Sequence, residues 1–70
     1  MPPDALDEDA RIIAAAYEER VKDLFKVFAE GVATGEPDRE GVIRFKRNLL
    51  AARRVRDLAL DVAKDADTAS

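Results

Sequence analysis

The sequence contains no cysteine and no histidine. Without cysteine the chain can form neither a disulfide nor a thiolate metal site. Without histidine it lacks the commonest general base and the commonest neutral metal ligand. It also cannot supply the Glu-x-x-His motif that holds di-iron centres in helical bundles. We therefore expect no cofactor and no metal ion.

The remaining residue types give no catalytic pattern either. The three glycines are not spaced as in phosphate-binding loops. The carboxylates are numerous but fall mostly on faces that helical spacing leaves exposed, not in paired acid and base positions. No histidine is present to activate the hydroxyl groups as nucleophiles. These hydroxyl groups belong to Tyr17, Thr34, Thr68 and Ser70. The sequence accordingly predicts a protein that is not an enzyme.

Long apolar runs are also missing. No run approaches the ~18 residues that a membrane-spanning helix needs, and the acidic start lacks the basic region of a signal peptide. A composition that is 47% hydrophobic and 39% charged is typical of a folded helical chain, not of a disordered one. We expect one domain over residues 1–70, located in the cytoplasm and without membrane contact.

A first helix is predicted over about 5–33. Asp4 is a plausible N-cap, and the prolines before it cannot extend the helix backwards, so residues 1–3 are expected to form a flexible tail. Apolar residues recur every eleven positions, about 3.67 residues per turn, which predicts a nearly straight helix. They share one face, made of Leu6, Ala10, Ile13, Ala14, Tyr17, Val21, Leu24, Phe25, Phe28 and Val32.

The segment from Thr34 to Pro37 is the one strong break. Gly35 suits the left-handed residue that ends a helix, and Pro37 suits the first turn of the next one. The second helix is expected over about 37–65, leaving 66–70 as a second flexible tail. Its apolar stripe consists of Phe45, Leu49, Ala52, Val55, Ala59, Val62, Ala63 and Ala66.

Two helices of similar length joined by a short turn predict an all-α antiparallel two-helix hairpin. Residues whose numbers sum to about 71 should then face each other. Gly31 and Gly41, on either side of the turn, are expected to let the two backbones approach closely. The expected neighbours are Phe28 with Ile43 or Phe45, Leu24 with Leu49, Tyr17 with Val55, and Ile13 with Ala59.

Each apolar stripe is wider than one neighbouring helix can cover. Phe25 and Val27 lie on opposite flanks of the first stripe, roughly 160° apart at about 100° per residue, and Leu49 and Val62 flank the second. A lone hairpin should therefore be marginally stable, whereas two hairpins dimerising into a four-helix bundle would bury both flanks. The predicted seam of this homodimer comprises Ile13, Tyr17, Leu24, Phe28, Phe45, Leu49, Val55 and Val62.

Two polar residues interrupt the second apolar stripe. Asn48 could fix the register of the helices by a hydrogen bond, as a buried asparagine does in coiled coils. Arg56 could pack its stem and keep its charge in water, or it could meet a carboxylate or the Tyr17 ring across the interface.

The charges are divided between the helices. Residues 1–33 hold eight acids and four bases, whereas residues 39–56 hold seven bases and one acid. The acidic helix could neutralise the basic one, within a hairpin or across a dimer, or the bases could bind phosphate groups. The exposed surface of the second helix that would meet another protein or a polyanion comprises Lys46, Arg47, Leu50, Arg53 and Arg54.

Three hypotheses follow. The first is a small non-enzymatic interaction or regulatory protein acting as a homodimeric four-helix bundle. The second is a regulator that binds RNA or DNA through the basic outer face of the second helix. A pI of about 4.8 and the lack of aromatic residues among the bases favour the first over the second. The third is a small subunit of a larger hetero-complex, which would meet its protein partner through Ile43 and Leu50.

Overall fold

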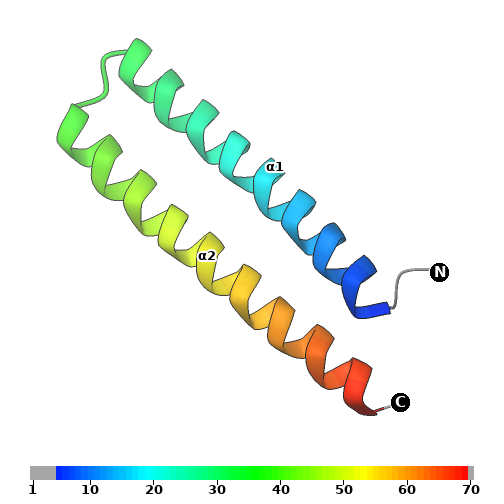
Figure 1. The fold of residues 1–70 in the computed structure, drawn as a ribbon. Helices are drawn as coiled ribbons and strands as arrows, with labels where there is room; N and C mark the ends of the chain where they lie inside the picture. The colour runs from blue at the N-terminus through cyan, green and yellow to red at the C-terminus, as the bar shows by residue number, and fades with distance from the viewer. Residues whose placement is uncertain (1–4, 70) are drawn as a thin grey trace.

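The computed structural model describes residues 5–69 and shows two long α-helices packed side by side (Figure 1). Helix α1 spans Ala5–Ala33 and helix α2 spans Asp38–Ala69. The helices run antiparallel (Figure 1). The turn joins them at one end of the hairpin, and the start of α1 lies beside the end of α2 at the other. The all-α hairpin expected from the sequence is confirmed.

Helix α1 has the predicted bounds, but α2 extends further than expected. It ends at Ala69, so residues 66–69, which were expected in a tail, are helical. No glycine or proline occurs in this segment to stop the helix. The Thr68 hydroxyl also donates a hydrogen bond to the Asp65 carbonyl at 3.0 Å. The rest of the two expected tails, residues 1–3 and 70, lies outside the described residues.

The turn ends α1 with a Schellman motif. The N–H of Glu36 donates to the carbonyl of Gly31 at 2.9 Å, and the N–H of Gly35 donates to the carbonyl of Val32 at 3.2 Å. This pair of bonds satisfies carbonyl groups that the end of a helix leaves without partners. Gly35 has a φ of 92°, the left-handed region that the motif requires and that a Cβ disfavours.

The glycines beside the turn make room for side chains, not for backbone. The Glu36 carboxylate occupies the space that a Cβ at Gly31 would fill. A Cβ at Gly41 would lie 3.5 Å from the Phe28 ring, which is ordinary contact distance. Glu36 also forms an ion pair with Arg44 at 2.6 Å. The expected close approach of the two backbones at these glycines is therefore not what the structure shows.

The contacts between the helices fit the expected neighbouring pairs, although their residue numbers sum to slightly more than the expected value of about 71. The rings of Phe28 and Phe45 lie 4.9 Å apart at 41°, which confirms that pair. Both this pair and the contact of Tyr17 with Arg56 sum to 73, not 71. A helical side chain covers the surface about one residue N-terminal to its own Cα. On antiparallel helices the two displacements add, so contacting residues sum to about two more than residues whose Cα atoms are level.

The hairpin is a single layer with little interior. Its radius of gyration is 16.2 Å, compared with about 11 Å for a compact chain of this length. It exposes 5627 Å², compared with about 4,300 Å² for a compact protein of 7.7 kDa. Among the side chains that the structure describes, Leu24 and Ala63 are the only buried apolar ones, each 7% exposed.

Replacing Gly35 by alanine tests the turn. Because alanine must adopt a positive φ there, we expect Gly35→Ala to lower the free energy of unfolding by about 1 kcal/mol. Gly35→Asn is the matched control, since asparagine tolerates this region better and should cost less. Urea denaturation at one fixed chain concentration measures both. Equal losses for the two variants would show that backbone conformation does not limit this position.

Candidate functional site

A continuous groove runs along one face of the hairpin between α1 and α2. Its central hollow has a volume of about 350 Å³ and shares Arg20 and Asn48 with a second hollow near the turn. It shares Ile13 and Ala59 with a third hollow toward the open end. Because adjoining hollows have common walls, the three form one groove, which we call the groove from here on.

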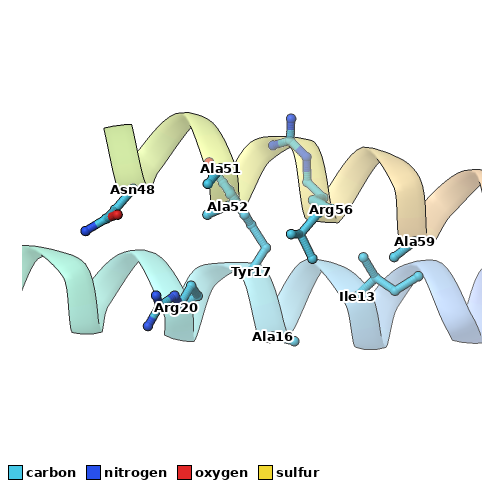
Figure 2. A pocket seen from close by; sticks show the side chains of 10 residues that line it. Ile13, Ala16, Tyr17, Arg20, Asn48, Ala51, Ala52, Arg56 and Ala59 are labelled. Atoms are coloured by element: carbon cyan, nitrogen blue, oxygen red, sulfur yellow. The ribbon is translucent and has the colours of Figure 1, made fainter. Parts of the chain in front are cut away.

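Small side chains open the groove at its centre. Ala16 on α1, together with Ala51, Ala52 and Ala59 on α2, line the central hollow (Figure 2). Tyr17 reaches from α1 toward α2 across this hollow (Figure 2). Methyl groups on both helices leave a gap that the neighbouring larger side chains do not fill. The arrangement gives a mostly apolar concave surface, to which Arg20, Asn48 and Arg56 contribute polar groups.

The predicted seam residues divide into two groups. Leu24 is buried, and most of the others are half-buried between α1 and α2. Val55 and Val62 are 65% and 68% exposed, although each lines the groove. The half-buried group comprises Ile13, Tyr17, Phe28, Phe45 and Leu49. The hairpin therefore covers one part of the predicted seam and leaves the other part open in the groove.

Arg56 stacks on an aromatic ring within the same chain. Its guanidinium carbon lies 4.5 Å from the centre of the Tyr17 ring, a cation–π contact. Its Nε also donates to a carboxylate oxygen of Asp57 at 3.1 Å. The Arg56 side chain is only 35% exposed. Of the alternatives raised by the sequence, the ring contact is present, and it joins α1 to α2.

Asn48 is half-buried in the groove and points from α2 toward α1 (Figure 2). Within residues 5–69 its amide makes no hydrogen bond with α1, so within the hairpin it does not play the one role that the sequence suggested for it, fixing the register. A half-buried amide in an open groove keeps its hydrogen-bonding capacity for water or for a molecule that covers the groove.

All five residues of the predicted outer surface of α2 are exposed. None of its bases forms an ion pair with a carboxylate of the described chain. By helical spacing this surface has two sides. Arg47 lies four residues before Ala51, a groove residue, and Arg54 lies three after it. Lys46 and Arg53, also seven residues apart, lie on the side of α2 away from the groove.

The described residues give no direct ion pair between the acids of α1 and the bases of α2. Lys22 pairs with Glu18 at 3.6 Å and with Glu19 at 3.4 Å, both within α1. The hydrogen bond and charge of Glu19, with the charge of Glu18, raise the pKa of Lys22. The ion pairs found in the described residues therefore do not include the direct pairing inside the hairpin that one interpretation of the charge pattern expects. The other interpretation of the charge pattern is that the acids and bases pair across a dimer.

Two further features limit the chemistry of the described part of the chain. Within residues 5–69 no three acidic side chains converge on a position that could hold a metal ion. Neither α1 nor α2, over the same residues, has a stretch apolar enough to cross a membrane.

Comparison with protein-family models, with curated proteins and with solved structures finds no match. The geometry of the groove and the charges is thus what bears on function.

The contact between Arg56 and Tyr17 can be tested by truncation. We expect Arg56→Ala to lower the free energy of unfolding by about 1 kcal/mol, because it removes a partly desolvated cation–π contact and its packed stem. Tyr17→Phe keeps the ring and should change stability by less than about 0.5 kcal/mol. Thermal and urea denaturation followed by circular dichroism measures both. If Arg56→Ala leaves the free energy of unfolding unchanged, the contact with Tyr17 contributes nothing to stability.

Proposed function

We propose that this chain is a small non-enzymatic interaction or regulatory protein that works as a homodimer. In this proposal a second copy covers the groove and completes a four-helix bundle. The observation that carries it is the exposure of Val55 and Val62 on the groove, at positions that belong to the apolar stripe of α2. Apolar side chains that form a continuous open surface are typical of protein–protein interfaces.

The exposed area supports the proposal. The chain exposes about 1,300 Å² more than a compact protein of its mass. A stable protein–protein interface takes about 800 Å² from each partner. Covering the groove along its length can supply an area of this size, since the hairpin measures 52 Å by 20 Å across its broad dimensions.

A second copy fits the groove better than an unrelated chain of one charge. The groove is lined by both helices, so two copies related by a two-fold axis present matching apolar stripes. The same chain also carries an acidic helix and a basic helix, and no ion pair joins the described parts of the two. A dimer can bring these opposite charges together.

Aspartate substitutions in the groove test the homodimer. Sedimentation equilibrium at micromolar concentration should give twice the chain mass for the natural sequence. Val55→Asp with Val62→Asp should weaken dimerisation at least tenfold, because the dimer would bury unpaired charge. Leu50→Asp is the control, since Leu50 is also apolar and exposed but lies on the outer side of α2. It should leave the mass unchanged.

A stable folded monomer would defeat the homodimer. If the aspartate variant dimerises as well as Leu50→Asp does, the dimer does not form through the groove. Because both valines are exposed in the hairpin alone, the aspartates should affect dimerisation and not the folding of the hairpin.

A nucleic-acid-binding regulator is the second candidate. Its support is that Lys46, Arg47, Arg53 and Arg54 are exposed and form no ion pair with the described carboxylates. If the bases bind phosphates, titration with mixed RNA and duplex DNA at about 50 mM salt should show binding that weakens steeply as salt rises. Lys46→Glu with Arg53→Glu should abolish it. No binding to the natural sequence would exclude this candidate.

A subunit of a hetero-complex is the third candidate. Ile43 and Leu50 are exposed on α2, and neither lines the groove. Phe25 and Val42 are likewise exposed and outside the groove. A homodimer through the groove would cover the Val27 flank of the first stripe but leave these four side chains uncovered, Phe25 on the other flank among them, so a different protein could bind there. A second protein that copurifies in stoichiometric amount from the native host would favour this candidate. The cytoplasmic location stays a prediction.

A further inference from the structure

One edge of the groove, on α1, is acidic. Glu19 lies three residues after Ala16, and Ala16 lines the groove. Asp23 lies four residues before Val27 and Glu30 lies three after it, and Val27 also lines the groove. Residues three or four apart are neighbours on a helix surface. The three carboxylates therefore follow the groove along α1, and all three residues are exposed. We call them the acidic edge.

The other edge of the groove, on α2, is basic over the half nearer the turn. Arg47 lies three residues after Arg44 and four before Ala51, which both line the groove. Arg54 lies three residues after Ala51. Arg44 itself is held by Glu36, whereas Arg47 and Arg54 form no ion pair in the described chain. We call Arg47 and Arg54 the basic edge.

Two hairpins can meet groove to groove in two ways that keep two-fold symmetry. If the axis runs along the helices, both turns lie at the same end and each α1 packs on the partner's α2. If the axis runs across the helices, the turns lie at opposite ends, α1 packs on α1, and α2 packs on α2. Both arrangements bury the same apolar groove, so charge at the edges distinguishes them.

With the turns at the same end, every residue keeps its height along the bundle. The register of 73 found within the hairpin then also relates α1 to the partner's α2. The partner's Arg54 comes level with Glu19. The partner's Arg47 comes level with Lys26, but it also lies within about one turn, roughly 5–6 Å of rise, of both Asp23 and Glu30. Arginine side chains span that distance, so each edge meets its opposite charge.

With the turns at opposite ends, the acidic edge of each α1 faces α1 of the partner. The N-terminal half of α1 adds Glu8 and Asp9 to the same contact, so carboxylates outnumber bases there even with Arg20 in the groove. The contact of α2 with α2 would be favourable, because the basic edge would approach Asp61 and Asp65. One contact of the two is then repulsive, whereas the first arrangement makes both attractive.

Three other bases lie near the acidic edge, and one of them, Arg20, lines the groove itself. Lys26 lies between Asp23 and Glu30 along the helix, but the edge still has three acids to one base. Lys22 already pairs with Glu19. Exposed pairs of this kind contribute little stability, but they set the orientation of a complex.

From these edges we infer that the two copies pack with their turns at the same end, so that α1 of each lies on α2 of the other. The inference rests on the proposed homodimer, and it assigns the acidic edge and the basic edge as the residues that fix its orientation. The partner's basic edge binds the acidic edge on both sides of the bundle.

A spin label at the turn measures the arrangement directly. Because the chain has no cysteine, Thr34→Cys gives one labelling position per chain. Turns at the same end place the two labels within about two helix diameters, roughly 20–25 Å. Turns at opposite ends separate them by about the length of α1, roughly 40 Å. Pulsed dipolar spectroscopy of the full chain reads this distance.

The outcomes separate the inference from the proposed function. A single short distance supports the same-end arrangement. A single distance near 40 Å overturns it and leaves the homodimer intact. Absence of dipolar coupling, together with a monomer mass in sedimentation, overturns both.

Charge reversal tests the two edges themselves. Asp23→Lys with Glu30→Lys should weaken the dimer roughly tenfold or more, and so should Arg47→Glu with Arg54→Glu. All four changes in one chain should restore the dissociation constant to within a few-fold of the natural value, because each edge again meets its opposite charge. If the four-fold variant stays as weak as either two-fold variant, the inference is wrong.

A matched pair controls for net charge. Lys46→Glu with Arg53→Glu changes the net charge by the same amount as the change at Arg47 and Arg54, with the same spacing of seven residues, but on the side of α2 away from the groove. We expect it to change the dissociation constant by less than about three-fold. An effect as large as that of the basic edge would show that overall charge, not edge pairing, governs the association.

Discussion

A helix pair has only one shared face, and the apolar stripes of this chain are wider than that face. The shared face takes up Leu24, Ala63 and the two phenylalanine rings that contact each other at a tilt. The flanks of the stripes have no second layer to cover them, so apolar side chains remain exposed along both sides of a flat hairpin. The apolar stripes are too wide for a single layer of two helices to cover. This explains the open groove and the large exposed surface for the mass, and it is the basis for proposing a partner that covers the groove.

The sequence was sufficient to predict the hairpin because its strongest signals are local. Gly35 has the positive φ that a helix end needs, and the break between helices occurs where Gly35 and Pro37 predict it. The pairing of Phe28 with Phe45 followed from counting residues around that turn. The two-residue difference in register arises from the lean of helical side chains toward the N-terminus, which a count of residues leaves out.

The groove was not predictable from the sequence alone, because it depends on which side chains lie opposite each other. Ala52 belongs to the predicted stripe of α2 whereas Ala16 belongs to neither stripe, yet together they line a hollow. Arg56 meets Tyr17 only in this register. The separate placement of acids and bases also depends on the rotation of each helix. The sequence shows an excess of acids on α1 and of bases on α2, but not that these charges lie on parts of the two helices that form no ion pair within the described hairpin.

Because few apolar side chains are buried in the described hairpin, the stability of the protein should depend on its concentration. If most of the interior forms only between two copies, folding and association are one reaction, and the fraction folded follows mass action. The unfolding temperature would then rise with chain concentration. Such a chain is sensitive to expression level: dilution alone would expose its helices to proteases, whereas accumulation would protect them.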